Sequence, residues 1–362
     1  MLYNIFFPLA EQFKIFNLFR YITFRSAGAI LTSLIIAFIT IPFLIRYLRK
    51  KFQKGQPIRN DGPQQHLAKQ GTPTMGGIAI VFSVLVSCLL WGNLSNSYLW
   101  VAMFVTLSCA LLGFADDYLK VSKYNTKGVP GKIKLVCQFA IAVIAGLWIE
   151  HIAPASYNSH ITFPFFKNFL LDLGWFYIPF IAVVIIGASN AVNLTDGLDG
   201  LAIMPIVIAF SCFAILAYVG GSSNFAHHLK LQFVEGSAEL TVFCAAMIGA
   251  GLGFLWYNAQ PAEIMMGDVG SLACGGAIGT VSVIVKHEIL LAIIGGLFVI
   301  EALSVIIQVY YFRFTKGKRF FKMAPIHHHF EKCGWSESKV VTRFWIIALI
   351  FAIIGLSTLK IR

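Results

Sequence analysis

The sequence predicts an all-α, polytopic membrane protein with about ten transmembrane helices. The chain of 362 residues is 58% hydrophobic and only 12% charged, and its mean hydropathy is +0.77. Apolar runs of about twenty residues recur along it, and a helix of that length crosses a bilayer. Because backbone groups in lipid must be hydrogen-bonded internally, we expect these runs to be α-helices. The ten predicted spans are 25–46, 75–94, 98–115, 133–150, 175–192, 201–220, 238–256, 270–286, 289–312 and 342–359.

The distribution of Lys and Arg predicts which side of the membrane each loop occupies. Alternate connections hold 20 of the 28 basic residues. By the positive-inside rule these connections are cytoplasmic and both termini lie on the outer, periplasmic side. The net charge of +12 is then explained by topology and by contact with the lipid bilayer, and we expect no nucleic-acid binding. The five cytoplasmic connections are 46–74, 117–134, 191–200, 257–269 and 313–343.

The rest of the chain gives little sign of further domains. Residues 1–20 lack the basic start of a signal peptide and are typical of an amphipathic segment at the membrane interface. Seven cysteines are scattered singly without any C-x-x-C pair, so neither a disulfide framework nor a zinc site is expected. We find no linker or convincing repeat and predict one integral membrane domain, residues 1–362.

Two adjacent carboxylates, Asp116 and Asp117, end one apolar span in the sequence ADDYLK. Carboxylates at a membrane boundary are costly to desolvate unless they meet water, a cation or a metal. Lys120 and Lys123 could pair with them as an ordinary solvated helix end. A pair of Asp residues is equally suited to hold Mg²⁺ against phosphates, because hard cations prefer carboxylate oxygens.

The stretch NAVNLTDGLDG places polar residues at steps of three after another apolar run. On a continuous helix, Asn190, Asn193, Asp196 and Asp199 would follow one slowly turning face. Such a row could be a solvated helix end, but the two Asn residues lie deeper than a cap requires. The glycines among them allow a ligand to approach the backbone, and the row therefore indicates a cleft.

Two further cytoplasmic connections carry candidate residues next to glycines. In HLAKQGTPTMGG, Lys69 and Thr74 precede an apolar helix whose free N–H groups could bind phosphate, although Thr and Pro before a helix are also ordinary capping residues. In MMGDVGS, Asp268 stands between glycines at the start of another span. An N-cap role would explain this Asp alone, but not a further carboxylate on the same membrane face.

Three consecutive histidines, His327, His328 and His329, occupy the last cytoplasmic connection. Consecutive side chains diverge, so the three cannot easily bind one metal, and we favour contact with an anionic substrate. Glu301 is the one carboxylate placed clearly inside a predicted span. We interpret it mainly as a buried group hydrogen-bonded to a neighbouring helix, with a direct role as the alternative.

Several long motifs, in order and in the expected loops, resemble those of the polyprenyl-phosphate N-acetylhexosamine-1-phosphate transferase superfamily. The resemblance covers essentially the whole chain, and the last motif is similar to the branch that uses a muramoyl-pentapeptide. It implies transfer of phospho-MurNAc-pentapeptide from UDP-MurNAc-pentapeptide to undecaprenyl phosphate, which yields lipid I and UMP in a bacterial plasma (inner) membrane. The motifs are RNDGPQQHLAKQGTPTMGG, ADDYLK, NAVNLTDGLDGLAIMP, MGDVGS and MAPIHHHFE.

The resemblance also implies roles for individual residues and a Mg²⁺ cofactor. Asp268 is the implied Mg²⁺ ligand, and Asp116, Asp117 and His327 complete the implied catalytic group. Met265 stands where many members of the superfamily have an aromatic residue that stacks on uracil; a thioether can also pack on a base. A homodimer is implied as well. The implied substrate-binding residues are Lys69, Thr74, Lys132, Asn190, Asn193, Asp196, Gly197, Leu198, Asp199, Asn258, Met265, His328 and His329.

The chemistry of the acceptor favours a one-step mechanism. The second pKa of a phosphate monoester is about 6, so the acceptor is mostly dianionic at neutral pH and needs little general-base help. We therefore expect direct in-line attack on the β-phosphate, and the rival is double displacement through an aspartyl-phosphate. A sister transferase that uses UDP-GlcNAc and a transporter are the alternative functions. The scarcity of charge inside the spans argues against a transporter.

Overall fold

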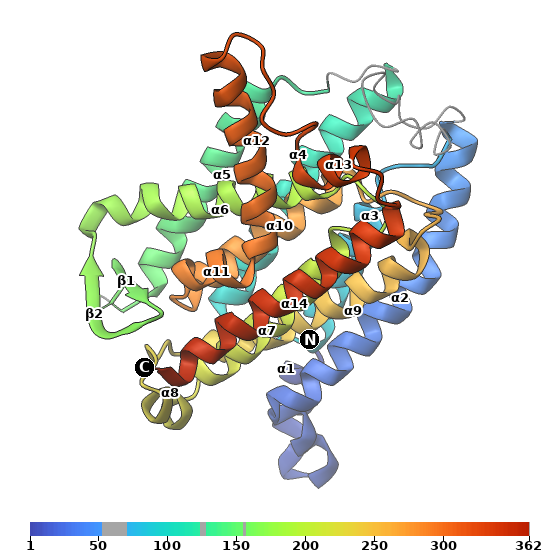
Figure 1. Ribbon diagram of the computed structural model, residues 1–362. Coiled ribbons are helices and arrows are strands. Elements are labelled where there is room, and N and C mark those ends of the chain that lie inside the picture. Colours follow the sequence, from blue (N-terminus) through green and yellow to red (C-terminus); the bar gives the residue numbers. More distant parts are fainter. Residues whose placement is uncertain (53–70, 124–127, 155–156, 362) are drawn as a thin grey trace.

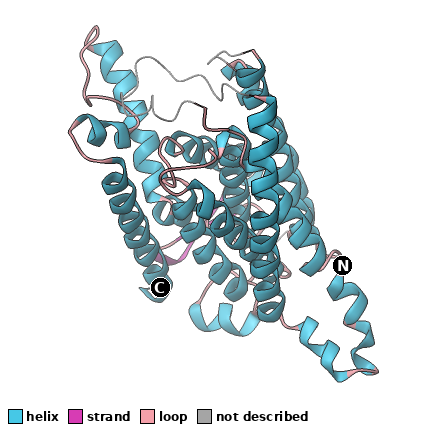
Figure 2. Cartoon of the chain, turned by 90° about the vertical axis from the view of Figure 1, so that its right-hand side faces the viewer, coloured by secondary structure: helices cyan, strands magenta, loops and turns pink. Residues whose placement is uncertain are grey.

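The computed structural model describes residues 1–52, 71–123, 128–154 and 157–361, and they form a bundle of long helices (Figures 1 and 2). Nine helices within these ranges are long and apolar enough to cross a membrane. The protein is therefore a multi-pass, predominantly helical membrane protein. The long helices are α2 (Ile22–Lys51), α4 (Ser97–Ser122), α5 (Gly131–Ile152), α6 (Tyr177–Thr195), α7 (Ile203–Gly220), α9 (Leu240–Asn258), α10 (Gly267–Ile284), α12 (Gly296–Phe314) and α14 (Glu337–Ile361).

Two of the ten predicted spans differ from the observed helices. The span predicted at 75–94 is helix α3 (Gly77–Trp91), whose 15 residues measure only about 22 Å along the axis, less than a typical hydrocarbon core. The span predicted at 289–312 is wrong at its start. It divides into a seven-residue helix, α11 (Glu288–Ile294), and α12, with Gly295 at the junction. Hydropathy could not detect this break because both pieces are apolar.

Helix α10 forms the centre of the bundle, with all but one of its residues buried. It packs against α4 on one side and α6 on another. Glycines permit these approaches: a Cβ on Gly113 of α4 would lie 2.2 Å from the Asp268 carbonyl oxygen, and one on Gly275 would lie 2.5 Å from the Ala188 carbonyl oxygen of α6. Small residues at helix contacts are how membrane bundles bring backbones together. This packing fixes the start of α10 beside the end of α4.

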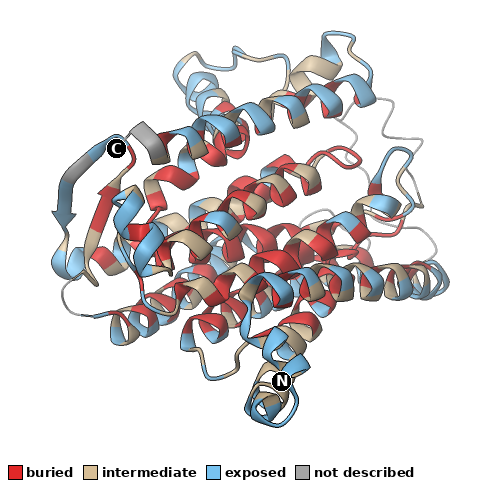
Figure 3. Ribbon diagram, turned by 90° about the horizontal axis from the view of Figure 1, so that it is seen from below, coloured by how far each residue is buried: buried red, intermediate tan, exposed pale blue. Residues whose placement is uncertain are grey.

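Exposed residues lie along the outward faces of the outer helices (Figure 3), and many of those on α2 are apolar. On α2, Leu31, Ile35, Ile39 and Phe43 recur at steps of four and are each more than half exposed. A stripe of this kind would be unfavourable in water, and it is the surface that lipid covers. The opposite face of α2 packs on α9.

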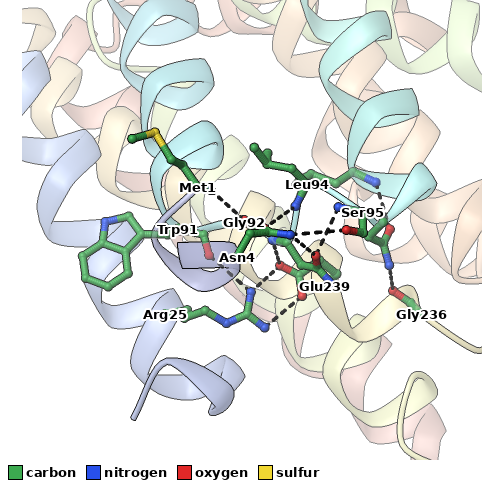
Figure 4. A network of polar contacts seen from close by, with 12 residues as sticks. Met1, Asn4, Arg25, Trp91, Gly92, Leu94, Ser95, Gly236 and Glu239 are labelled. Carbon is green, nitrogen blue, oxygen red and sulfur yellow. Dashed lines mark hydrogen bonds and ion pairs between the residues drawn. The ribbon is translucent and has the colours of Figure 1, made fainter. Parts of the chain in front are cut away.

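A polar network ties the first long helix to its neighbours at the end of the bundle remote from the start of α10 (Figure 4). Arg25 donates to both carboxylate oxygens of Glu239, at 2.5 and 2.9 Å, and to the carbonyl of Trp91 at 3.2 Å. The backbone N–H of Asn93 donates to Glu239 as well. Both charged side chains are buried, so each depends on the other for compensation.

Short elements complete the described chain. The N-terminal segment forms brief helices without buried residues, and its Asn4 contacts the loop after α3. An antiparallel hairpin, which the sequence analysis did not predict, pairs His160 with Asp172 and Ile161 with Leu171. The short elements are α1 (Leu2–Phe6), η1 (Pro8–Glu11), η2 (Lys14–Arg20), β1 (His160–Phe163), β2 (Phe166–Asp172), η4 (Gly174–Phe176), α8 (Ser223–Leu229), η5 (Ser237–Glu239) and α13 (Ile326–Lys332).

Candidate active site

Three buried carboxylates meet where α4 ends and α10 begins. Asp116 and Asp117 are each 1% exposed and Asp268 is 9% exposed. Each offers an oxygen, and these oxygens lie within 4.8 Å of one another. Oxygen ligands from three carboxylates fit a hard divalent cation. We call Asp116, Asp117 and Asp268 the Asp triad.

Two lysine ammonium groups lie among the carboxylates of the Asp triad. Lys120 Nζ lies 2.5 Å from Asp116 Oδ2 and 3.2 Å from Asp268 Oδ2. Lys134, from the first turn of α5, lies 2.7 Å from Asp268 Oδ2 and 3.2 Å from Asp116 Oδ1. The two cations compensate much of the negative charge buried there. The pairing with Lys120 that a solvated helix end would show is therefore observed, but the carboxylates are buried rather than solvated and Lys123 is exposed.

Backbone groups hold two of the carboxylates in place. Val129 N–H donates to Asp116 Oδ1 at 2.8 Å, and Val269 N–H donates to Asp117 Oδ2 at 3.2 Å. The other oxygen of Asp117 accepts no hydrogen bond within the described residues, and the Lys120 ammonium is 3.9 Å from it. A buried carboxylate oxygen with unused lone pairs is available to an added cation.

Asp268 does not cap its helix, so the alternative explanation for this residue is wrong. Met266 occupies the N-cap position of α10 and makes no side-chain capping bond. Gly267 has a φ of +72°, and a Cβ there would lie 2.4 Å from Asp117 Oδ2 and 2.7 Å from Thr74 Oγ1. Only glycine allows this turn and leaves room for both oxygens. The turn directs Asp268 toward the lysines.

The loop before α3 is fixed to the loop before α10 by backbone hydrogen bonds. Gly76 and Gly77 donate to the carbonyls of Met265 and Met266, and Met265 donates to Pro73. The first two N–H groups of this helix start are therefore occupied, and the prediction that they are free to bind phosphate is wrong. Thr74 is 4% exposed and its hydroxyl has no hydrogen-bond partner among the described residues. Lys69 lies outside the described residues.

The row predicted at NAVNLTDGLDG is divided, because α6 ends at Thr195. Asn190 donates to Gln138 Oε1 at 3.0 Å, and Asn193 accepts from Ser271 at 3.1 Å, so both face neighbouring helices. The prediction of one helical row of four is therefore wrong. The last two members lie in a separate turn.

The turn after α6 is held by contacts with two other segments. Asp199 accepts from the Ala262 N–H at 3.0 Å, and Asn258 accepts from the Gly200 N–H at 3.0 Å. Leu198 is fully buried and belongs to a small core cluster with residues of α14. These three predicted substrate-binding residues thus also hold the turn together.

Asp196 lies in the same turn, beyond the membrane-spanning part of α6. Burial, assisted by the negative charge of Asp268, raises the pKa of Asp196 to about 7 from its ordinary value of 3.8. The carboxyl is therefore near its midpoint of protonation at neutral pH. A carboxyl group whose charge changes near neutral pH therefore lies beside the Asp triad.

The three histidines of α13 point in different directions, as the sequence analysis predicted. His327 is fully buried and its Nδ1 lies 3.0 Å from Glu301 Oε1. His328 pairs with Glu331, and His329 accepts from the backbone N–H of Lys322. The expected hydrogen bond between Glu301 and a neighbouring helix is confirmed, with His327 as the partner.

Lys134 was not predicted as a site residue. Lys132 was predicted to bind substrate instead, and it is exposed in the structure. Both lysines precede the same apolar run two positions apart, so they project to different sides of α5. Choosing between them needs the position of α5 relative to α4 and α10. Lys120 was considered only as a partner that would neutralise the Asp pair, whereas it also contacts Asp268 on another helix.

Comparison with known proteins identifies the family of the chain. Residues 99–286 match the model of glycosyl transferase family 4, and residues 69–81 match the phospho-N-acetylmuramoyl-pentapeptide-transferase signature 1. A phospho-N-acetylmuramoyl-pentapeptide-transferase of Ruegeria sp. (strain TM1040) is 57% identical over 354 residues, which cover 98% of each chain. The chain therefore belongs to the phospho-N-acetylmuramoyl-pentapeptide-transferase family.

Proposed function

We propose that the protein transfers phospho-MurNAc-pentapeptide from UDP-MurNAc-pentapeptide to undecaprenyl phosphate, giving lipid I and UMP in peptidoglycan synthesis. The name of the 57% identical relative supports this activity. Within the structure, the Asp triad with Lys120 and Lys134 carries the proposal, because it combines carboxylates for a cation with ammonium groups for phosphates.

Mg²⁺ is the proposed cofactor, and the donor set fits it. Asp268 would be the principal ligand, with Asp116 and Asp117 beside it. When bound, the ion would supply charge stabilisation to the pyrophosphate of the donor substrate. Lys120 and Lys134 contact the same carboxylates in the structure, and with the ion bound there their ammonium groups would be available to phosphate oxygens.

The residues of the site support a one-step transfer. The acceptor phosphate is mostly dianionic at pH 7, so it can attack without first being deprotonated by a carboxylate of the site. The chain's task is then to hold the acceptor in line with the donor β-phosphate and to stabilise the charge that develops on the departing UMP. The lysines supply this stabilisation, and the turn at 196–199 with His327 binds the nucleotide sugar.

The active site is proposed to lie on the cytoplasmic side of a bacterial inner membrane. The enzyme is proposed to act as a homodimer. The ends of α4 and α9 and the starts of α5, α10 and α14 lie toward the same end of the bundle (Figure 1). The loops at this end hold most of the basic residues, which the positive-inside rule assigns to the cytoplasm.

One assay tests the activity. The purified protein in detergent, with undecaprenyl phosphate and Mg²⁺, is supplied with UDP-MurNAc-pentapeptide or with UDP-GlcNAc, and UMP is measured. We expect UMP release from the first donor, dependent on both lipid and metal. Release from UDP-GlcNAc alone would identify the sister activity instead. Radiolabelled phosphate retained on the protein from labelled donor in the absence of lipid would contradict the one-step mechanism.

A further inference from the structure

We propose that Glu301 is a positioning residue, which fixes the ring of His327 so that its Nε2 faces the turn at 196–199, the proposed nucleotide-sugar site. This inference rests on the proposed function, because it assigns a supporting residue to the same site. Glu301 is fully buried in α12, and its Oε1 lies 3.0 Å from His327 Nδ1. In the proposed role Nδ1 donates this hydrogen bond and the Glu301 carboxylate accepts it.

The opposite ring nitrogen of His327 lies against the turn after α6. Nε2 is buried and has no hydrogen-bond partner among the described residues. A Cβ on Gly197 would lie only 2.3 Å from Nε2, which shows that this nitrogen faces the turn after α6. A buried polar atom without a partner carries a free-energy cost that a substrate contact would remove.

The surrounding apolar contacts fix α13, and the His327 ring itself lies against the His328 ring and beside Glu301. Leu297 lies one turn before Glu301 on α12 and belongs to a cluster against which Ile326 and Phe330 pack. This cluster would hold α13 in place without a carboxylate. A buried carboxylate is costly, and an apolar pair of similar volume would often be at least as stable. The role that remains for Glu301 is to select the tautomer and direction of the imidazole.

A double-mutant cycle tests whether Glu301 acts through His327. Glu301→Gln, His327→Ala and the double variant are compared for UMP release and for affinity toward UDP-MurNAc-pentapeptide by calorimetry. We expect Glu301→Gln to lower kcat/KM at least about tenfold in the wild-type background and to have little effect once His327 is removed. If the His327→Ala protein has no measurable turnover, the cycle is evaluated on affinity.

The tautomer of His327 gives a second readout that a purely structural role would not change. In protein labelled with ¹⁵N-histidine, the signals lost in His327→Ala identify this ring. We expect Nδ1 to be protonated in the wild type and the tautomers to mix in Glu301→Gln. The matched control is Glu288→Gln, which removes another buried carboxylate, one that accepts from Tyr177. Its effect should be equal in both His327 backgrounds.

Equal losses from Glu301→Gln with and without His327, or unchanged His327 signals, would overturn the positioning role. These outcomes differ from a failure of the proposed function. A wild-type protein that releases no UMP from UDP-MurNAc-pentapeptide contradicts the function, whereas the His327 signals are measured without turnover.

Discussion

Lys134 Nζ bridges two helices, because it lies 2.7 Å from Asp268 Oδ2 on α10 and 3.2 Å from Asp116 Oδ1 on α4. Its neighbour Lys132 is exposed. The two lysines therefore provide a matched pair of positions on α5, one within the proposed site and one outside its ion pairs.

Removal of the Lys134 ammonium is expected to impair transfer much more than removal of the Lys132 ammonium. Lys134→Met keeps most of the apolar stem but leaves Asp116 and Asp268 with less positive charge. We expect UMP release to fall roughly 100-fold, the order found when one group that stabilises developing charge is lost. Lys132→Met should remain within a few-fold of wild type. The reverse ranking would restore Lys132 as the substrate-binding lysine.

Asp268→Asn is expected to abolish transfer while the protein still folds in membranes. The substitution preserves the shape of the side chain but removes a charged oxygen ligand from the Asp triad. Binding of Mn²⁺, followed by its paramagnetic resonance signal as a substitute for Mg²⁺, should weaken by at least about tenfold. Asp172→Asn, in the hairpin, is the control and should bind as the wild type does. Unchanged Mn²⁺ affinity in Asp268→Asn would exclude this residue as the metal ligand.

The sequence predicted which side of the membrane the site residues share better than it predicted the contacts among those residues. Hydropathy and basic loops placed Asp116, Asp117 and Asp268 at one side of the membrane, and the structure brings their oxygens within 4.8 Å. This succeeded because alternating spans return every second loop to the same side. The role of Lys134 could not be predicted in the same way, because its partners lie on other helices. For Glu301 the sequence indicated a hydrogen bond to a neighbouring helix but not that His327 is the partner.

Local patterns also failed where tertiary contacts replaced them. The N–H groups of Gly76 and Gly77 are available in an isolated helix start, but the chain before α10 occupies them. Likewise, the steps of three in NAVNLTDGLDG suggest a continuing helix, whereas the turn after Thr195 is held by Asn258 and Ala262. A periodic pattern describes a helix only as far as the helix continues.

Gly197→Ala is expected to weaken substrate binding because the added methyl group would lie 2.3 Å from His327 Nε2. The ring cannot retreat easily while Glu301 holds Nδ1. Overpacking of this kind typically costs about 1–3 kcal/mol. Gly187→Ala is the control, since it lies in the preceding helix α6 and its Cβ would meet no atom within 4 Å. Calorimetric affinities for UDP-MurNAc-pentapeptide that are equal in the two variants would contradict the crowding.

Arg25→Ala is expected to destabilise the protein without altering the chemistry of its folded fraction. The substitution leaves the buried carboxylate of Glu239 without its bidentate partner (Figure 4), which typically costs about 3–5 kcal/mol. Arg46→Ala, at an exposed position of the same helix, is the control. Thermal unfolding in detergent should show a lower midpoint only for the Arg25 variant. An unchanged midpoint there would show that water replaces the lost guanidinium.

Asp196→Asn is expected to stabilise the metal-free protein, and more so as the pH rises. Burial raises the pKa of Asp196 to about 7, so between pH 4 and pH 7 the folded state retains a proton that the unfolded state has released. Stability contributed by this group therefore falls across that window and stays low above it. Asparagine removes the titration.

In EDTA, the unfolding midpoint of Asp196→Asn should exceed that of wild type clearly at pH 8 and much less at pH 5. Asp172→Asn, whose carboxylate is exposed and has its pKa lowered by hydrogen bonds from Ser159 and Gly174, should show no gain at pH 8. A gap between Asp196→Asn and wild type that is independent of pH would contradict the titration of Asp196 and leave a change in packing as the cause.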